Sequence, residues 1–374
     1  MEEMSNIRHE NMMTFPVNTI SLLYQNGKFV DEDFAQWAIE HNRKWSDSNL
    51  FCDSSVNSLS NCCRLKNDIT ELYFNSIGGT ALQVGSVKVS TINLARLALD
   101  VNSTEEYIQE LYNRTWTNCQ VLDAVRHIIK RNVEKGLLPN FSFGLVSFDS
   151  LYSTTGIIGI YETMKRFGFV EQDSLGNNYY TKEAEELGQK IFNTIRKAHK
   201  DFIEKYNCDY KFNIEQVPGE QSASKMMRAD KFFYPDADIY DLPLYGNQFM
   251  PLGIKTTLQE RVRVQALFDS YCNGGSILHA NIDAPFDSFE KAWKMVNYIA
   301  GAGVTYFAFN TKIQTCEDNH AFYGHECPVC GKPVETEYTR IVGFFTPIKA
   351  WSKDRKEEYK LRRWHPLNKE GTEG

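Results

Sequence analysis

The chain has no run of 18 apolar residues, and no hydrophobic stretch follows a basic N-terminus. A membrane span and an export signal each need such a stretch, so we expect a cytoplasmic protein with no membrane partner. Basic residues are also too few to dominate, because 41 Lys and Arg stand against 48 Asp and Glu, a formal net charge of −7. This balance argues against direct nucleic-acid binding through bulk electrostatic attraction.

Internal repeats and low-complexity tracts are lacking as well, which argues against a repeat architecture. The 374 residues, 42% of them hydrophobic, are enough for a large core and for two or three domains. Nine cysteines are an odd number, and three of them lie between Cys316 and Cys330. Free thiols and metal ligation therefore fit this chain better than a disulfide framework.

Predicted strands and helices alternate along the chain, which favours an α/β architecture. Strand-like segments are expected at 15–20, 84–92, 144–148 and 306–310, and helices at 31–45, 104–136, 157–167 and 182–206. Residues 1–14 are polar and carry no periodic pattern, so we expect an N-terminal tail there.

The clearest local signal is a group of metal-ligating side chains, Cys316, His320, Cys327 and Cys330. The second half is a Cys-x-x-Cys pair whose thiolates can close on one zinc ion, and Gly331 permits the tight turn. His320 is the natural fourth ligand, with His325 as a competitor. Four protein ligands leave no open coordination position, so the metal would be structural. The alternative is a reduced, metal-free surface loop.

Two adjacent cysteines, Cys62 and Cys63, precede Arg64. Neighbouring side chains in an extended loop diverge, so only one of the two thiols can point into a pocket. Taken alone, the pair is equally consistent with two buried thiols beside an exposed arginine.

The segment 215–224 reads as the end of a strand, a turn at Pro218 and Gly219, and the start of a helix. The free N–H groups of a helix start, with the hydroxyls of Ser222 and Ser224, would attract a phosphate. An ordinary capped helix is the alternative.

A single glycine near the C-terminus, Gly343, lies in the segment 339–345, after the zinc-binding segment and before a basic, aromatic tail. Read together with the cysteine pair, this glycine suggests radical chemistry.

In this order the segments resemble one family, the large subunit of the anaerobic (class III, glycyl-radical) ribonucleoside-triphosphate reductases. The resemblance is carried by Phe15-Pro16-x-x-Thr19-Ile20, Cys62-Cys63-Arg64-Leu65, Thr91-x-Asn93-Leu94-x-Arg96, Glu215-Gln216-x-Pro218-x-Glu220, Gly274-Gly275-x-x-x-His279, the zinc segment, Arg340-Ile341-Val342-Gly343-Phe344 and Lys356-Glu357-Glu358. It covers nearly the whole chain. It implies part of a ten-stranded α/β barrel over 15–310, with a radical-cysteine finger loop, and a zinc-binding and glycyl-radical domain over 311–374.

The resemblance implies that an iron–sulfur activase uses S-adenosylmethionine to remove an α-hydrogen from Gly343. Glycine suits this role because, without a Cβ, its α-carbon can flatten and delocalise the unpaired electron. The radical would pass to Cys63, with Cys62 as the fallback, and the thiyl would abstract the ribose 3′-hydrogen of a ribonucleoside triphosphate. Water then leaves from C2′, and formate supplies the electrons. The chain has no cysteine after Cys330, which fits a formate-dependent enzyme.

The same resemblance suggests residues that hold the substrate. Asn93 would hydrogen-bond the ribose or formate. The substrate phosphates would lie at the turn formed by Pro218, Gly219, Glu220, Ser222 and Ser224. Family members are usually longer, so we expect the C-terminal part of a split or truncated reductase. A second, N-terminal reductase polypeptide would supply the missing strands, and the complete enzyme would be a homo-oligomer.

Two rival functions remain open at this point. A glycyl-radical enzyme of the formate acetyltransferase type also pairs adjacent cysteines with an Arg-x-x-Gly motif, but the zinc segment and the phosphate-type turn argue against it. A non-catalytic, zinc-stabilised assembly module is the second rival. The missing half of the barrel favours it, and the retention of both Cys63 and Gly343 argues against it.

Overall fold

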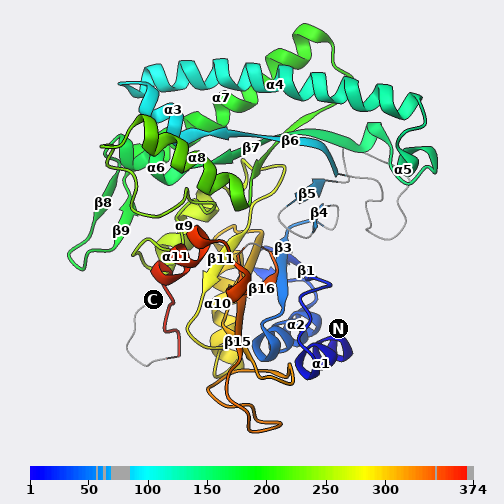
Figure 1. The fold of residues 1–374 in the computed structure, drawn as a ribbon, viewed down its shortest axis with the longest axis vertical. Helices are drawn as coiled ribbons and strands as arrows, with labels where there is room; N and C mark the ends of the chain where they lie inside the picture. Colours follow the sequence, from blue (N-terminus) through cyan, green and yellow to red (C-terminus); the bar gives the residue numbers. More distant parts are fainter. Residues whose placement is uncertain (56–57, 62–64, 69–84, 342, 369–374) are drawn as a thin grey trace. The chain divides into compact units, whose positions relative to one another are not determined.

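The computed structural model describes residues 1–55, 58–61, 65–68, 85–341 and 343–368. They form two compact units, each built from segments distant in the sequence (Figure 1). The first unit comprises Met1–Ser55, Leu252–Ala266 and the chain from Ile277 onward, and the second comprises the remainder. The predicted domain boundary between residues 310 and 311 does not coincide with a boundary between these two units, and it stays a prediction.

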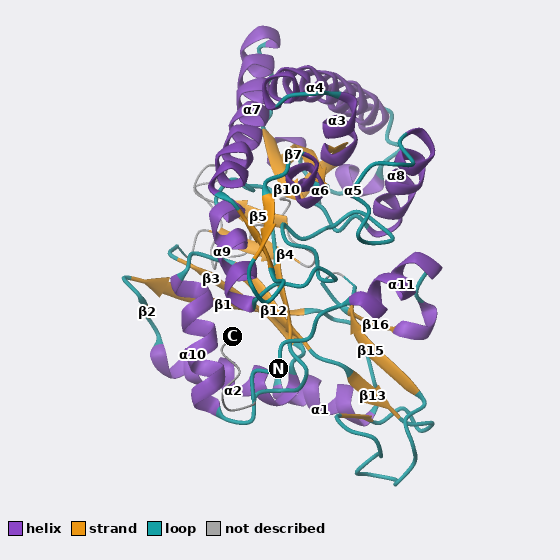
Figure 2. Cartoon of the chain, turned by 90° about the vertical axis from the view of Figure 1, so that its left-hand side faces the viewer, coloured by secondary structure: helices purple, strands orange, loops and turns teal. Residues whose placement is uncertain are grey.

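The first unit is built on a five-stranded sheet with the strand order β11-β12-β3-β1-β2. Its strands are β1 (Asn18–Gln25), β2 (Lys28–Phe29), β3 (Ser48–Asp53), β11 (Leu278–Asn281) and β12 (Tyr306–Asn310). β1 runs parallel to β3, β11 runs parallel to β12, and β12 meets β3 antiparallel. The helices α2 (Glu32–Trp45) and α10 (Phe289–Gly301) lie side by side next to this sheet, and α9 (Leu258–Asp269) begins in the same unit (Figure 2).

The two faces of this sheet differ in chemistry because successive side chains of a strand point to opposite sides. One face carries apolar residues such as Ile20, Leu50 and Phe307, which form a core with α2, α9 and α10. The residues that alternate with them are largely polar and include Thr19, Asn49, His279, Asn281 and Tyr306. The sheet therefore offers a polar face to whatever packs on its second side.

A four-stranded antiparallel sheet completes the first unit, with the strand order β14-β13-β15-β16. Its elements are β13 (Ile313–Thr315), β14 (Ala321–Phe322), β15 (Thr336–Arg340) and β16 (Phe345–Pro347), followed by the 3-10 helix η2 (Ile348–Ala350) and α11 (Lys353–Leu361). The short connection between β15 and β16 contains Gly343.

The predicted N-terminal tail is wrong, because residues Glu2–Glu10 form the helix α1. Ser5 and Arg8 on this helix are buried. Arg8 Nη1 donates to Asp47 Oδ2 at 2.6 Å, and its Nη2 donates to the carbonyl of Pro16 at 2.6 Å. A polar segment can be buried when its charges are paired in this way. A local sequence pattern cannot show a partner 39 residues away.

The second unit is built on a three-stranded parallel sheet with the order β10-β7-β6. The strands are β6 (Gly85–Asn93), β7 (Leu151–Ile158) and β10 (Phe212–Gln216). The helices are α3 (Leu94–Asp100), α4 (Thr104–Glu134), α5 (Pro139–Ser142), α6 (Ile160–Arg166), α7 (Lys182–Tyr206) and α8 (Glu220–Phe233), with the 3-10 helix η1 (Phe148–Ser150). Two small hairpins are formed by β4 (Ser58–Asn61) with β5 (Leu65–Asp68), and by β8 (Val170–Gln172) with β9 (Asn178–Tyr180). The long helices α4 and α7 pack on each other, and α4 covers β6 and β7 (Figure 1).

Most predicted elements are present, and two need correction. The predicted strand at 144–148 is absent from that segment, where the chain turns at Gly144 (φ +71°) and the strand begins only at Leu151. The predicted helix at 157–167 begins at Ile160, because β7 continues to Ile158 and Gly159 (φ +85°) makes the turn between them. The predicted α/β class is confirmed. Within the described residues, no helix has both the length and the apolar character that crossing a bilayer requires.

Candidate functional site

Four side chains converge in the loops next to β13 and β14, namely Cys316, His320, Cys327 and Cys330. Their ligand atoms all lie within 4.8 Å of one another. The Sγ of Cys316 is 3.5 Å from His320 Nδ1 and 3.6 Å from Cys330 Sγ, and Cys327 Sγ is 3.6 Å from His320 Nδ1. A tetrahedral zinc ion with bonds of about 2.0 to 2.3 Å separates its ligands by roughly 3.5 to 3.8 Å. The donor set and its spacing therefore fit zinc, with His320 rather than His325 in the group.

The local backbone explains how these ligands meet. Cys316 directly follows β13, and His320 directly precedes β14. Gly331 adopts φ +68°, and its N–H donates to the carbonyl of Cys327 at 2.9 Å, which closes the Cys-x-x-Cys turn as predicted. The N–H of Met12 donates to the carbonyl of Asn319 at 3.0 Å, so the segment after α1 braces the same loop.

Gly343 is buried in the connection between β15 and β16. Nδ2 of Asn49 donates to the Gly343 carbonyl at 3.4 Å and to the Tyr306 hydroxyl at 2.8 Å. The Tyr306 hydroxyl also contacts Thr19 Oγ1 at 3.2 Å. These three side chains come from β3, β12 and β1. The glycine thus lies against the polar face of the five-stranded sheet.

The strand that precedes Gly343 is fixed by Arg340, whose side chain is 1% exposed. Its Nη1 donates to the Phe309 carbonyl at 3.1 Å, and its Nη2 donates to the Ser46 carbonyl at 2.9 Å. The guanidinium also lies 4.1 Å from the centre of the Phe345 ring. Burial lowers the pKa of Arg340 to about 10, so the group remains a cation at neutral pH. Arg340 therefore ties the base of the Gly343 turn to β12 and to the residue two positions before β3, and both strands are interior to the sheet.

The candidate thiyl residues, Cys62 and Cys63, lie outside the described residues. They stand in the sequence between β4 and β5, which pair antiparallel from Asn61 and Leu65 onward. Their role stays a prediction.

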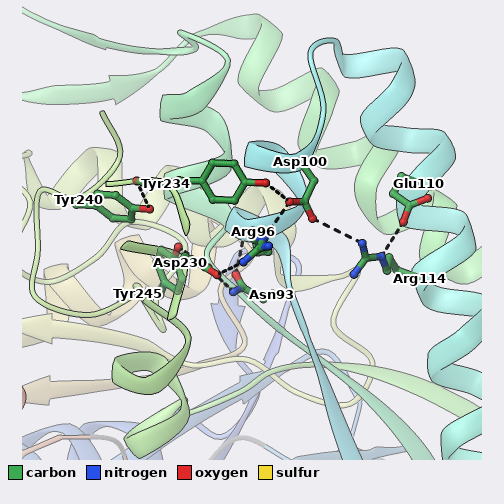
Figure 3. A network of polar contacts seen from close by, with 9 residues as sticks. All are labelled: Asn93, Arg96, Asp100, Glu110, Arg114, Asp230, Tyr234, Tyr240 and Tyr245. Atoms are coloured by element: carbon green, nitrogen blue, oxygen red, sulfur yellow. Dashed lines mark hydrogen bonds and ion pairs between the residues drawn. The ribbon is translucent and has the colours of Figure 1, made fainter. Parts of the chain in front are cut away.

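The predicted site residue Asn93 belongs to a polar network in the second unit (Figure 3). Its Oδ1 accepts from the Arg96 N–H at 3.1 Å and caps α3, and its Nδ2 donates to Asp230 Oδ2 at 2.7 Å. The same carboxylate accepts from Arg96 Nη1 at 3.1 Å and from the Tyr245 hydroxyl at 2.7 Å. Both ends of the Asn93 amide are thus engaged within the protein. A contact with ribose or formate stays a prediction.

The predicted strand, turn and helix around Pro218 and Gly219 are confirmed. β10 ends at Gln216, and Gly219 (φ +73°) is the N-cap of α8. Asn247 Nδ2 donates to the Pro218 carbonyl at 2.8 Å, and the Ser222 hydroxyl donates to the Gly219 carbonyl at 2.8 Å. A Cβ at Gly219 would come within 2.6 Å of Ile158, so the turn requires glycine on two grounds. Phosphate binding at this turn, with Glu220 and the buried Ser224, stays a prediction.

A buried carboxyl group holds the loop that contacts this turn. Glu162 is 2% exposed, and its Oε1 accepts from the N–H of Gly246 at 2.9 Å. Burial raises the pKa of Glu162 to about 7. Asn247, which follows Gly246, donates to the Pro218 carbonyl. The Glu162 carboxyl therefore stabilises the loop that contacts the turn at Pro218.

The family model described as anaerobic ribonucleoside-triphosphate reductase matches residues 1–365. The chain belongs to this family. A solved anaerobic ribonucleotide reductase is 40% identical, with a TM-score of 0.88 over 97% of this chain. The Thermotoga maritima anaerobic ribonucleotide reductase in complex with dATP and CTP is also 40% identical, with a TM-score of 0.84 over 96% of this chain.

The same Thermotoga maritima enzyme with glycerol in its active site is 39% identical, with a TM-score of 0.84 over 96% of this chain. The chain spans 57% of the first of these structures and 58% of the other two. Among curated proteins, none matches the chain. Membership of the anaerobic ribonucleoside-triphosphate reductase family confirms the resemblance and the α/β fold class, and it does not favour the acetyltransferase alternative.

The sequence pattern did not identify Asn49, which contacts Gly343, or Tyr306, which contacts Asn49. A signal was available, because Asn49 is an amide beside the apolar run Leu50-Phe51-Cys52 of the mostly buried strand Ser48–Asp53. Polar residues are seldom fully buried without a specific partner.

Proposed function

We propose that this chain takes part in the anaerobic reduction of ribonucleoside triphosphates to deoxyribonucleotides, with the organic radical stored on Gly343. The observation that carries the proposal is the buried Gly343 itself, in an Arg-x-x-Gly segment that is tied to the polar face of a sheet. Arg340, three residues before the glycine, holds the base of that turn, and the side chain of Asn49 contacts the glycine carbonyl.

The radical at Gly343 supplies one-electron chemistry when it is present. We propose that it passes to Cys63, or to Cys62, and that the resulting thiyl abstracts the ribose 3′-hydrogen. The 2′-hydroxyl then leaves as water, and the two electrons that this reduction needs come from formate, which is oxidised to carbon dioxide. The radical is installed by an iron–sulfur activase that uses S-adenosylmethionine.

The substrate phosphates are proposed to bind at the turn between β10 and α8. Helix starts have unpaired N–H groups and a positive end of the helix dipole, which together favour a phosphate. Gly219 allows the backbone to adopt the required left-handed conformation there. A related enzyme has been solved with dATP and CTP, so a pyrimidine ribonucleoside triphosphate is a sensible first substrate to test.

The zinc ion is proposed to be structural. Cys316, His320, Cys327 and Cys330 occupy all four tetrahedral positions, so a bound ion would have no position left for a substrate. The segment 331–340 joins this cluster to the turn that holds Gly343. The ion would therefore stabilise the unit that presents the glycine.

The test is an anaerobic assay of the chain, mixed with an N-terminal reductase polypeptide, a family activase, S-adenosylmethionine, formate and CTP, in which dCTP is measured by chromatography. We expect product with the wild type and none with Gly343→Ala. Gly85→Ala is the matched control, because among the described residues a Cβ at that position meets only Leu151 at 3.5 Å, an ordinary contact. Formation of dCTP by Gly343→Ala at the wild-type rate would contradict the proposal.

A further inference from the structure

Asn49 is fully buried on β3, and its amide nitrogen faces two acceptors. The distances are 2.8 Å to the Tyr306 hydroxyl and 3.4 Å to the Gly343 carbonyl. A side-chain amide carries two N–H groups, so Nδ2 can serve both acceptors at once. The contact with Gly343 joins residues that lie 294 positions apart in the sequence.

We propose that Asn49 is a positioning residue for Gly343, holding the glycine carbonyl in one orientation against the polar face of the sheet. The inference rests on the proposed function, because it assigns Asn49 a role toward the radical at Gly343. A glycine residue has the widest range of backbone conformations, so a glycine in a turn needs an outside contact to fix its peptide plane. Asn49 supplies that contact from a strand in the middle of the sheet.

Tyr306, which accepts from the Asn49 amide, is itself held in place. The Tyr306 side chain is 1% exposed, and its hydroxyl contacts Thr19 Oγ1 at 3.2 Å as well as Asn49. The base of the Gly343 turn is tied to the same strand, because Arg340 donates to the carbonyl of Phe309 on β12. Two residues of β12 therefore help to hold the turn. Phe309 accepts from Arg340 at the base of the turn, and Tyr306 orients Asn49, which contacts Gly343.

The hydrogen bond has an electronic consequence for a radical centred on the α-carbon. Such a radical is stabilised when the adjacent carbonyl withdraws electron density and stays coplanar with the α-carbon. A donor on the carbonyl oxygen favours both conditions, and in a buried site its effect is stronger than in water. Loss of the donor is thus expected to alter the spin distribution as well as the mobility of the turn.

The first experiment needs no radical. Hydrogen–deuterium exchange is followed by mass spectrometry for peptides covering 338–346 in the unactivated protein. Asn49→Asp keeps the shape of the side chain and removes its N–H donors, and we expect exchange there to rise about two- to tenfold, the net effect of one hydrogen bond. Asn297→Asp is the matched control, because it makes the same exchange on α10, where Asn297 Nδ2 donates to the Trp293 carbonyl at 2.9 Å, and it leaves this exchange unchanged.

Tyr306→Phe keeps the test decisive if the Asn49 variant does not fold. It removes the acceptor that orients the Asn49 amide and leaves Asn49 in place, so a smaller rise in the same peptides is expected. Thermal melting reports whether each variant is folded. Exchange equal to that of the wild type in folded Asn49→Asp, or in folded Tyr306→Phe when the first variant is unfolded, overturns the inference.

The second experiment uses electron paramagnetic resonance on the protein activated in the presence of the N-terminal reductase polypeptide. With Asn49→Asp, we expect the glycyl doublet to change its splitting and to decay faster than in the wild type and in Asn297→Asp. A wild-type protein without any doublet contradicts the proposed function, whereas a wild-type doublet that Asn49→Asp leaves unchanged in splitting and lifetime contradicts the inference alone.

Discussion

Arg8 of the N-terminal helix and Asp47, which directly precedes β3, form a buried ion pair with a distance of 2.6 Å from Nη1 to Oδ2. Ser5 Oγ donates to the same carboxylate oxygen at 2.7 Å. The residue before Asp47 is Ser46, whose carbonyl accepts a hydrogen bond from Arg340. The N-terminal helix is therefore connected through two neighbouring residues to the strand that carries the Gly343 turn.

Asp47→Asn is expected to lower the free energy of unfolding by about 3 kcal/mol at pH 7, because it leaves Arg8 buried without its countercharge. Burial alone would raise the pKa of Asp47, but hydrogen bonds from His41 and Ser5 and the charge of Arg8 hold it well below its ordinary value of 3.8. A lowered pKa stabilises the folded state above pH 3.8, and this stabilisation is lost as the pH falls through the folded-state pKa. The difference between variant and wild type should thus shrink below about pH 4.

Chemical denaturation at pH 7 and pH 3 measures this difference. Glu40→Gln is the control, because Glu40 pairs with Arg43 on the partly exposed surface of α2, where an ion pair contributes less than about 1 kcal/mol. A destabilisation by Asp47→Asn that is the same at both pH values would show that the charge of Asp47 is not what matters.

Cys327→Ser is expected to abolish zinc binding, since three ligands hold a structural ion far more weakly than four. Inductively coupled plasma mass spectrometry on purified protein should give one zinc per chain for the wild type and close to none for the variant. Cys208→Ser is the control, because Cys208 is only partly buried and lies outside the four-ligand group. Zinc that persists in Cys327→Ser would contradict the assigned ligand set.

Glu162→Gln is expected to flatten the pH dependence of stability. Burial raises the pKa of Glu162 from 4.5 to about 7, so the folded protein binds its proton more tightly than the unfolded chain does. The wild type therefore loses stability as the pH rises from 5 to 8, by up to about 3 kcal/mol from this group. Glutamine can still accept from the Gly246 N–H and has no such charge. Thermal melts across this pH range test the point, and parallel curves for the two proteins would count against it.

Asn93→Ala is expected to cost about 1 to 2 kcal/mol of stability, because it removes the cap of α3 and one donor to Asp230. Urea denaturation measures this loss. Steady-state kinetics on the same variant then separates a structural role from the predicted substrate contact. A variant of wild-type stability with a raised KM for the substrate or for formate would show that Asn93 acts on the ligand and not on the fold.

The sequence predicts best those features that depend on neighbouring residues. The helix Lys182–Tyr206 is present with the predicted bounds, because its apolar residues repeat at helical spacing and Thr181 caps its first turn. The metal-ligand group is found with the predicted residues for the same reason, since its spacing is local.

Features that depend on distant partners could not be predicted from local sequence patterns. The helix Glu2–Glu10 reads as a solvated tail until Asp47 is seen to pair with Arg8. The strand Leu151–Ile158 owes its bounds to pairing with β6 on one side and β10 on the other. Asn49 could not be assigned to Gly343, because no local motif links a strand residue to a turn 294 positions later.

The central claim is that Gly343 carries the radical, and electron paramagnetic resonance on the anaerobic protein tests it most directly. The protein is treated with a family activase and S-adenosylmethionine, with Gly343→Ala alongside. We expect a doublet in the wild type, its absence in the variant, and cleavage of the backbone at position 343 when air is admitted. A doublet of equal intensity in Gly343→Ala, or cleavage at another residue, would contradict the assignment.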